Sequence, residues 1–372
     1  MLVGVPKEIK THEYRVGLIP GSVRELVHHG HKVVVQSQAG VGIGVTDAEY
    51  EAAGAAIAGD ADEVFAKADM IVKVKEPQSA EYKKLRGGQI LFTYLHLAAE
   101  RELTKALVES GCTAIAYETV TDAAGGLPLL APMSEVAGRM SIQAGAHCLE
   151  RAQGGRGILL GGVPGVPPAD VLVLGGGVAG TNALRTAIGL GARVTVIDKS
   201  VRRLNELEFR FGASLTTVYA TIDAVEQRAP HVDLIVGAVL VPGATAPKLV
   251  TKAMLGRMRK GAVLVDISID QGGCFETSRP TTHAEPTFTL DGVVHYCVTN
   301  MPGAVPRTST FALNNVTLPF VMALAGKGYR KALMDNAHLK NGLNVHRGKV
   351  TFEAVAREFS YAFTPADTAL AS

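Results

Sequence analysis

The segment Gly175-Gly176-Gly177-Val178-Ala179-Gly180 matches the pattern G-x-G-x-x-G, in which Gly175, Gly177 and Gly180 are the three defining glycines. An apolar run over 170–174 precedes them, and a helical segment over 178–190 follows. In such a turn Gly175 permits a tight bend, Gly177 lets the backbone approach a pyrophosphate, and Gly180 lets the helix lie close to the sheet. The free N–H groups and partial positive charge of the helix N-terminus favour bound phosphates. The segment therefore predicts the phosphate-binding turn of a dinucleotide site.

An acid stands where such a site needs one. A second strand is expected over 193–197, and Asp198 follows it. A carboxylate at this place accepts hydrogen bonds from an adenosine ribose and repels a 2′-phosphate, so NAD is the predicted cofactor in preference to NADP. The alternative is a glycine-rich loop that merely joins a strand to a helix, and it would leave the acid unexplained.

Outside this motif, four ionisable side chains stand near the ends of expected strands: Arg15, Lys75, His96 and Asp270. The planar fork of Arg15 suits a carboxylate, and a lysine placed like Lys75 points into the crevice where doubly wound sheets bind ligands. A histidine such as His96 is suited to moving protons, because an unperturbed imidazole titrates near neutral pH. Asp270 precedes a glycine turn, whereas Asp266 lies inside the same strand and is expected to be structural.

Each of these residues also has an ordinary reading: a solvated loop arginine, a surface lysine, a satisfied core histidine and a turn cap. Other clusters indicate less. His28, His29 and His31 surround a helix end, where imidazoles commonly face solvent, so no metal site is expected. Ser134 and Ser141 lack a G-x-S-x-G elbow, which disfavours a serine hydrolase.

The elements that must position these residues alternate regularly. In the first third, short apolar strands are expected over 1–5, 32–36, 70–74, 89–94 and 113–116, with helical segments over 22–29, 46–53, 81–85 and 100–110 between them. Later strands are expected over 234–237, 263–267 and 295–298. Long helices are expected over 134–151, with Ser134 as N-cap, and over 309–325, and the remainder to Phe363 reads as helical and turn-rich.

This alternation predicts an α/β protein with two Rossmann-like, doubly wound domains of parallel strands. We predict an NAD-binding domain over 131–306, inserted into a substrate domain formed by 1–130 and 307–372, with the long helices as links. The site is expected between the domains, at the carboxyl ends of the strands.

Length and composition indicate a soluble globular protein of about two domains. The 372 residues are 47% hydrophobic and 19% charged, with a net charge of +2 and no basic run, so no nucleic-acid partner is expected. No apolar stretch reaches the roughly 18–20 residues that span a bilayer, and the N-terminus lacks a signal-peptide core, so no membrane partner is expected. Four separated cysteines indicate reduced thiols in a cytoplasm.

Nearly the whole chain resembles the alanine dehydrogenase and pyridine nucleotide transhydrogenase family. Besides the glycine motif, the resemblance is carried by Val5-Pro-Lys-Glu-Ile-Lys10, Glu13-Tyr-Arg-Val16, Val74-Lys-Glu-Pro77, Tyr94-Leu-His-Leu-Ala98, Pro132-Met-Ser-Glu-Val-Ala-Gly138, Asp266-Ile-Ser-Ile-Asp-Gln-Gly-Gly273 and Asn300-Met-Pro-Gly-Ala-Val-Pro306. So many segments in family order make the resemblance specific.

The resemblance implies reversible oxidative deamination of L-alanine to pyruvate and ammonium, with NAD as hydride acceptor. It implies that Arg15 and Lys75 hold the substrate carboxylate and carbonyl, that His96 is the general acid and base, and that Asp270 orients water in the carbinolamine steps. It also implies a homohexamer with one long helix at the subunit contacts.

The same resemblance implies a set of cofactor contacts. Together with the glycines, the residues expected to line the NAD site are Ser134, Val178, Ala179, Asp198, Arg203, Val239, Leu240, Ile267, Asp270, Arg279, Val298, Asn300 and Met301. Ala220 replaces a serine that the family usually has near the adenine ribose, which removes one polar contact.

Two other functions are open at this point. The chain could be the NAD-binding component of a proton-translocating transhydrogenase, which would bind NAD without amino-acid chemistry. The pairing of His96 with Asp270 and the lack of a hydrophobic C-terminal extension oppose that reading. It could also be a non-catalytic NAD sensor, which would bind NADH without turnover.

Overall fold

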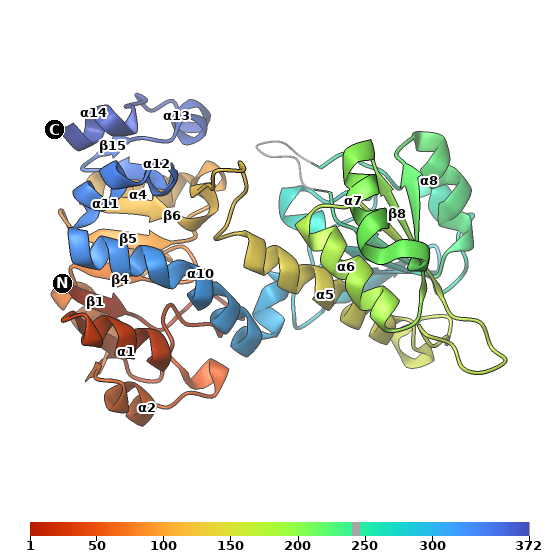
Figure 1. Cartoon of the computed structure of the whole chain (residues 1–372), viewed down its shortest axis with the longest axis horizontal. Helices are drawn as coiled ribbons and strands as arrows, with labels where there is room; N and C mark the ends of the chain where they lie inside the picture. Colours follow the sequence, from red (N-terminus) through yellow and green to blue (C-terminus); the bar gives the residue numbers. More distant parts are fainter. Residues whose placement is uncertain (240–245, 372) are drawn as a thin grey trace. The chain divides into compact units, whose positions relative to one another are not determined.

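The computed structural model describes residues 1–239 and 246–371, which form two compact units (Figure 1). The first unit comprises Met1–Met133 and Val305–Ser372, and the second comprises Ser134–Ala304. The sequence-based divisions stand at 130/131 and 306/307. Leu240, one of the expected cofactor residues, lies outside the described residues.

The first unit is built on a sheet of eight strands in the order β15-β14-β6-β5-β4-β1-β2-β3. In chain order these strands are β1 (Leu2–Val5), β2 (Lys32–Gln36), β3 (Ala56–Ala58), β4 (Met70–Val72), β5 (Ile90–Thr93), β6 (Thr113–Ala116), β14 (Leu343–His346) and β15 (Lys349–Val350). Strands β1 to β6 are parallel, and β1 lies between β2 and β4, so the chain reverses its direction of travel there. Doubly wound sheets bind ligands at such a reversal.

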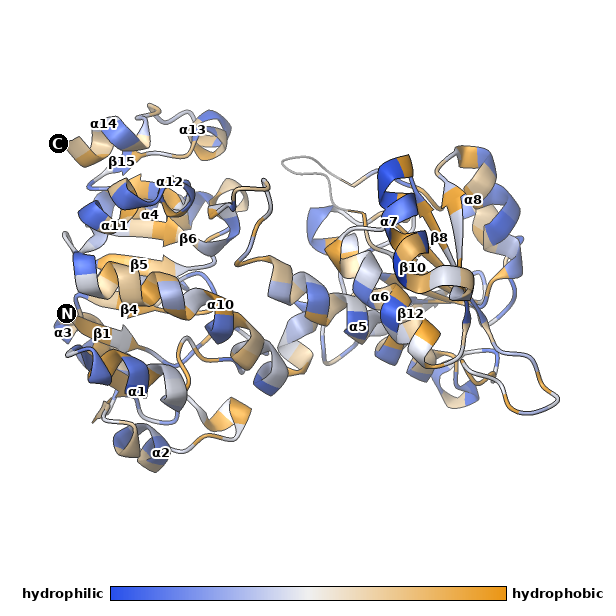
Figure 2. Ribbon diagram, in the orientation of Figure 1, coloured by the Kyte–Doolittle hydropathy of each residue, from blue (hydrophilic) through white to orange (hydrophobic). Residues whose placement is uncertain are grey.

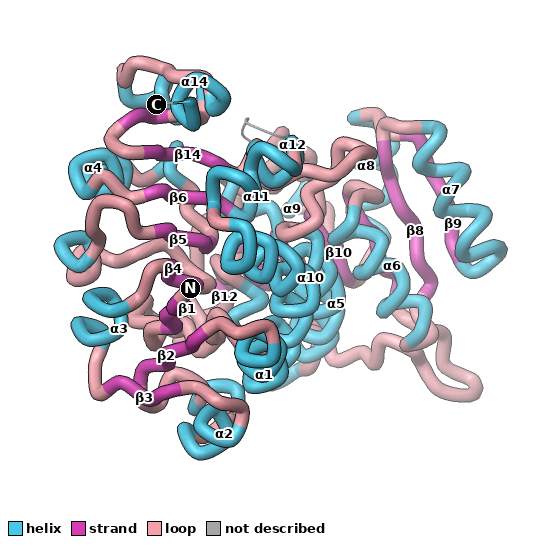
Figure 3. The backbone as a smooth tube through the Cα atoms, turned by 60° about the vertical axis from the view of Figure 1, so that its left-hand side comes forward, coloured by secondary structure: helices cyan, strands magenta, loops and turns pink. Residues whose placement is uncertain are grey.

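Helices cover both faces of this sheet (Figure 3). Alternate strand residues point to opposite faces: Val33 and Val35 join one apolar cluster, and Val34 joins the other. The helices of the unit are α1 (Pro20–His28), α2 (Asp47–Ala52), α3 (Ala61–Lys67), α4 (Arg101–Ser110), α10 (Pro306–Lys327), α11 (Tyr329–Asp335), α12 (Ala337–Lys340), α13 (Glu353–Phe359) and α14 (Ala366–Ala371). Helices α1, α10 and α11 pack on the first face, and α3, α4 and α13 pack on the second.

The second unit repeats the plan with a sheet in the order β12-β13-β11-β10-β7-β8-β9. Its strands are β7 (Asp170–Leu174), β8 (Arg193–Asp198), β9 (Leu215–Tyr219), β10 (Leu234–Gly237), β11 (Val263–Asp266), β12 (Thr287–Leu290) and β13 (Val293–Tyr296). Its helices are α5 (Ala131–Cys148), α6 (Val178–Gly189), α7 (Val201–Phe211), α8 (Ile222–Arg228) and α9 (Lys252–Leu255). All strands but β12 run parallel, and the reversal lies between β7 and β10.

The expected α/β class with two Rossmann-like sheets is confirmed. In Figure 2 the strands of both sheets are largely orange and the outer helix surfaces carry most of the blue. Small residues on α5 allow close packing: a Cβ on Gly138 would lie 2.1 Å from the carbonyl oxygen of Ala179, and one on Gly145 would lie 2.8 Å from Leu234. Within the described residues we find no helix long and apolar enough to cross a membrane.

Two local predictions are wrong. Ser134 is not an N-cap, because α5 begins at Ala131 and Ser134 lies inside its first turns. Pro132 is tolerated in that first turn, since the N–H that a proline lacks would have no helical partner there. The segment after 309–325 is not wholly helical either, because β14 and β15 extend the first sheet with antiparallel strands. Their two-residue loop, Arg347-Gly348, has positive φ at both positions, which is the hairpin geometry that X-Gly pairs favour.

Several elements were not anticipated at all. The sequence prediction omitted β3, β9 and β12 among the strands, and α3, α7, α8, α9 and α14 among the helices. The expected helix over 81–85 is a single 3-10 turn, Tyr82–Lys84. The strand expected over 295–298 is β13, which begins and ends two residues earlier.

Candidate functional site

Loops at the carboxyl edge of the first sheet carry three of the four expected site residues. Arg15 lies in the loop after β1, Lys75 in the loop after β4, and His96 in the loop after β5. Because β1, β4 and β5 are parallel neighbours, these loops leave the sheet at the same edge. The structure thus gathers at one edge three side chains that lie far apart in the sequence.

Arg15 is held by a carboxylate two residues away. Its guanidinium donates to Glu13 from Nε at 2.7 Å and from Nη2 at 2.5 Å, and Nη1 lies 3.1 Å from the sulfur of Met133. Arg15 is only 2% exposed and Glu13 4%. Burial alone would lower the pKa of Arg15, but the hydrogen bonds and charge of Glu13 outweigh burial and raise it. The guanidinium is therefore a fixed cation at this edge.

The loop that carries Lys75 rests on a buried ion-pair cluster. Glu8 accepts from the backbone N–H groups of Val74 at 2.6 Å and of Lys75 at 3.3 Å. Beneath them Lys73, fully buried, donates to Glu8 and to Glu81 at 3.0 Å each. Burial would lower the pKa of Lys73, but these two carboxylates raise it. Lys75 itself is half-buried.

A further carboxylate follows Lys75. Glu76 is buried and forms an ion pair with the more exposed Lys10. Burial by itself would raise the pKa of Glu76, but the charges of Lys75 and Lys10 outweigh it and hold that pKa below its usual value. Glu76 therefore adds a buried negative charge beside the lysine expected to bind substrate.

His96 is held by its backbone and by a ring. Its N–H donates to Glu118 at 2.6 Å, and the N–H of Leu95 donates to the same carboxylate at 3.2 Å. The imidazole, which is exposed, stacks on Tyr94 with 5.8 Å between ring centroids and 10° between planes. Tyr94 is anchored in turn, since its hydroxyl donates to the carbonyl of Leu129 at 2.5 Å.

One arrangement recurs at all three positions. The backbone N–H of each expected substrate-side residue donates to a glutamate: Arg15 to Glu13 at 3.1 Å, Lys75 to Glu8, and His96 to Glu118. Glu8, Glu13 and Glu118 were not among the site residues predicted from the sequence. Glu8 and Glu13 do stand in the family-like segments, but Glu118 stands outside them, and only the fold brings it to His96.

In the second unit the glycine turn has the geometry that a dinucleotide requires. Gly175 has a φ of +97°, and a Cβ there would lie 2.7 Å from the carbonyl oxygen of Ala238, directly after β10. A Cβ on Gly180 would lie 1.8 Å from the carbonyl oxygen of Gly175. Gly177 is the N-cap of α6, and a Cβ there would meet only open space. The turn therefore keeps an open, amide-lined surface at the helix N-terminus, and these residues fit a pyrophosphate.

Asp198 and Arg203 brace this turn. Asp198, the last residue of β8, accepts the N–H of Gly176 at 2.7 Å and that of Ser200 at 2.7 Å. Arg203 donates to the carbonyl of Gly176 at 2.7 Å and to the hydroxyl of Thr181 at 2.6 Å. Both expected cofactor residues thus touch the loop.

The other expected cofactor residues also follow strand ends in this sheet. They are Val239 after β10, Ile267 and Asp270 after β11, and Val298, Asn300 and Met301 after β13. The hydroxyl of Ser268 donates to the carbonyl of Val239 at 2.7 Å and so joins two of these loops. Ser134 lies on α5, and Val178 and Ala179 begin α6. The guanidinium of Arg279 packs on the ring of Phe288, with 4.2 Å between its central carbon and the ring centroid.

Asp266 and Asp270 differ as expected. Asp266 is fully buried and accepts from the N–H groups of Ser268 and Cys274 and from the hydroxyl of Ser278. Burial raises its pKa despite these bonds. Asp270 is exposed, in a 3-10 turn (Ile267–Gln271) beyond β11. Of these two acids, Asp266 is buried and held by the fold, and Asp270 is the one exposed to solvent.

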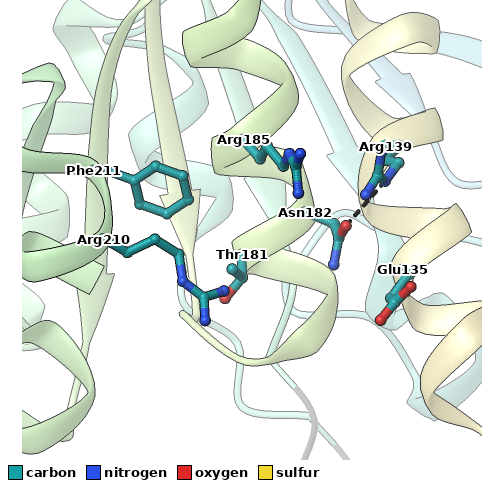
Figure 4. Close-up of a pocket in the computed structure, with 7 residues that line it drawn as sticks. All are labelled: Glu135, Arg139, Thr181, Asn182, Arg185, Arg210 and Phe211. Atoms are coloured by element: carbon teal, nitrogen blue, oxygen red, sulfur yellow. Dashed lines mark hydrogen bonds between the residues drawn. The ribbon is translucent and has the colours of Figure 1, made fainter. Parts of the chain in front are cut away.

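A hollow of about 660 Å³ opens elsewhere on the second unit (Figure 4). It lies among α5, α6 and α7 and is lined by Glu135, Arg139, Thr181, Asn182, Arg185, Arg210 and Phe211. Arg139 donates to Asn182 at 3.0 Å across it. The sequence predicted none of these residues as site residues. No group of three or more potential metal ligands occurs in the part of the chain that the structure describes.

Family models match both parts of the chain. Residues 4–137 match the model described as "Alanine dehydrogenase/PNT, N-terminal domain", and residues 141–353 match "Alanine dehydrogenase/PNT, C-terminal domain".

Individual proteins give the same picture. The alanine dehydrogenase of Halomonas elongata is 63% identical over 98% of this chain and 99% of its own. A solved structure of L-alanine dehydrogenase is 53% identical, with a TM-score of 0.94 over 97% of this chain and 99% of that one. The crystal structure of a transhydrogenase from Sinorhizobium meliloti is more distant, at 26% identity and a TM-score of 0.83 over 94% of this chain and 100% of that one.

Proposed function

Because the chain belongs to the alanine dehydrogenase/PNT family, we propose that it catalyses the reversible, NAD-dependent oxidative deamination of L-alanine to pyruvate and ammonium. The observation that carries this function is the full-length similarity to alanine dehydrogenases, at 63% identity in one of them. The likeness to a transhydrogenase is much weaker, at 26% identity. The chain is an oxidoreductase of the amino-acid dehydrogenase type, and NAD is its cofactor.

The first unit supplies the substrate-side groups in this proposal. Arg15 pairs with the substrate carboxylate, and Lys75 donates to the carbonyl oxygen of pyruvate. His96 takes a proton from the attacking water and returns it as ammonium leaves. Asp270, which belongs to the second unit, is proposed to orient that water. Overall, L-alanine, NAD⁺ and water give pyruvate, ammonium, NADH and a proton.

The second unit supplies the cofactor site. NAD, when bound, accepts the hydride from the substrate Cα. The amides at the start of α6 face the pyrophosphate, and Asp198 accepts from the adenosine ribose. We assign NAD binding to 131–306 and substrate binding to 1–130 and 307–372. Family resemblance further supports a cytoplasmic homohexamer.

A simple assay tests the function. NADH absorbance is followed with pyruvate and ammonium present, and we expect it to fall only when both are added. The variant His96→Ala should lose at least about 100-fold in kcat, the usual scale for a general acid or base. Its affinity for NADH, measured by fluorescence, should stay within about twofold.

Other outcomes would separate the alternatives. A wild-type protein that binds NADH but never oxidises it in the presence of pyruvate and ammonium would be a sensor or a transhydrogenase component. Near-wild-type turnover by His96→Ala would remove His96 from the mechanism while leaving the function intact.

A further inference from the structure

Glu118 lies where it controls the backbone that carries His96. It sits in the 3-10 turn Tyr117–Thr119, directly after β6, and is half-buried. Strands β5 and β6 are parallel neighbours with Thr93 opposite Ala116, so both loops leave the same edge. Resting on the proposed function, we infer that Glu118 is a positioning residue that acts through His96.

The carboxylate of Glu118 is shared by two consecutive peptide groups. One oxygen accepts from His96 N–H at 2.6 Å, and both oxygens lie 3.2 Å from Leu95 N. Hydrogen bonds to an ionised acceptor are stronger than neutral ones. Glu118 therefore fixes the peptide plane from which the imidazole projects.

This anchoring is needed because His96 adopts an uncommon backbone conformation. Its φ of 49° and ψ of 37° place it in the left-handed region, which residues other than glycine seldom occupy. The surrounding structure must hold such a residue in place. Glu118 holds the backbone and Tyr94 stacks on the ring, so the exposed imidazole keeps one orientation without being buried.

A carboxylate is better suited to this task than an amide. Leu95 and His96 present two N–H donors, and both oxygens of Glu118 can accept. A glutamine has one acceptor oxygen, and its NH₂ group would face a donor. Glu118→Gln should therefore keep the size of the side chain and only part of the anchoring, whereas Glu118→Ala should lose all of it.

Steady-state kinetics with pyruvate, ammonium and NADH test the inference. We expect kcat to fall about tenfold in Glu118→Gln and about 100-fold in Glu118→Ala, approaching the loss in His96→Ala. The KM for pyruvate and the affinity for NADH should change by less than about threefold, because the proposed binding groups for pyruvate and for NADH do not include His96. As a control, Asp69→Asn removes a carboxylate that accepts a backbone N–H, from Leu2, at the opposite edge of the same sheet, and it should leave kcat unchanged.

A double mutant separates positioning from general damage. If Glu118 acts through His96, adding Glu118→Ala to His96→Ala should cost no further activity. Hydrogen exchange provides a readout without turnover: Glu118→Gln should speed exchange in the peptide containing Leu95 and His96 and leave the other strands of the sheet unaffected. If Glu118→Ala does not fold, the double mutant is made with Glu118→Gln instead.

Defined results would overturn the inference. One such result is a wild-type kcat in Glu118→Gln together with unchanged hydrogen exchange at residues 95–96. Another is a loss of kcat from Glu118→Ala that is equally large whether or not His96 is present. An inactive wild type would instead contradict the proposed function, and the exchange measurement would still decide whether Glu118 anchors the loop.

Discussion

The carboxyl edges of the two sheets hold their functional segments by different means. In the second unit the turn is shaped by residues that lack side chains, and Gly175 and Gly180 lie only five positions apart. In the first unit the loops are held by glutamates, two of which are distant in sequence: Glu8 is 67 residues from Lys75 and Glu118 is 22 from His96. Close backbone packing at glycines thus shapes the cofactor turn, which Asp198 also braces from 22 residues away, whereas hydrogen bonds to glutamate side chains hold the substrate-side loops.

The difference has a chemical reason. A pyrophosphate is bound by backbone amides, so its site needs close backbone approach. A small 2-oxo acid is bound by charged side chains, and those charges must be held in fixed directions after partial removal from water. Carboxylates do this at the first edge, and for Glu8 and Glu13, which are buried, the cost of burial is offset by pairing.

The largest effect is expected from breaking the buried pair of Arg15 and Glu13. Arg15→Met leaves the Glu13 carboxylate buried without its guanidinium, and such a break typically costs about 3–5 kcal/mol. The midpoint of urea unfolding should fall accordingly. Adding Glu13→Gln to Arg15→Met should recover much of the stability but none of the activity. Strictly additive losses in the double variant would argue that the two residues do not act as a pair.

A smaller effect is expected at the glycine turn. Gly180→Ala places a Cβ 1.8 Å from the carbonyl oxygen of Gly175, and the turn must move to admit it. Overpacking of this kind costs about 1–3 kcal/mol, and we expect NADH affinity to fall roughly tenfold to 100-fold. The affinity is measured by titrating the protein with NADH and following its fluorescence.

The matched control lies on the same helix. Gly189 ends α6, is exposed, and a Cβ there would meet nothing within 4 Å. Gly189→Ala should therefore bind NADH as the wild type does and be slightly more stable. Equal losses in the two alanine variants would mean that close packing at Gly180 is not what shapes the site.

The same contrast explains what the sequence could predict. The order strand, glycine turn, helix, strand and Asp198 lies within about thirty residues and follows known local rules, so β7, α6 and β8 were predictable. The positive φ at His96 was not, because no glycine marks it. Glu118 looks like an ordinary charged residue after a strand, and its contact with the His96 loop depends on the pairing of β5 with β6.

The errors in element boundaries have local causes. Ser134 resembles an N-cap, but three residues before it also adopt helical geometry, since a first-turn proline does not end a helix. The hairpin of β14 and β15 was missed although Arg347-Gly348 and the alternating Leu343-Asn-Val-His346 were visible signals. Its strands are short, and the antiparallel edge did not fit the expected parallel order.

Replacing Asp198 should shift cofactor preference by about one order of magnitude. Asp198→Asn keeps an oxygen that can accept from Gly176 but removes the negative charge that repels a 2′-phosphate. The ratio of NADPH to NADH affinity should rise about tenfold, or roughly 1.4 kcal/mol. Asp198→Gly should relax the cofactor preference too. It should also lower the affinity for both cofactors, because the glycine turn loses the carboxylate that accepts from Gly176. An unchanged ratio in both variants would place Asp198 away from the ribose.

The smallest effect concerns the acid stability of the first edge. Lys75 and Lys10 lower the pKa of Glu76 in the folded protein against the opposing effect of burial, so its ionised form stabilises the fold above the ordinary value of 4.5. That contribution disappears as the pH falls below 4.5 and the carboxylate takes up a proton. At pH 7 the free energy of unfolding of Glu76→Gln should be lower than that of the wild type. The difference should be less than about 1 kcal/mol, because Lys10 is partly exposed. The variant and the wild type should converge once the pH falls below the folded-state pKa of Glu76, which lies below 4.5. A constant difference across that range, measured by urea unfolding at each pH, would show that Glu76 contributes through packing and not through its charge.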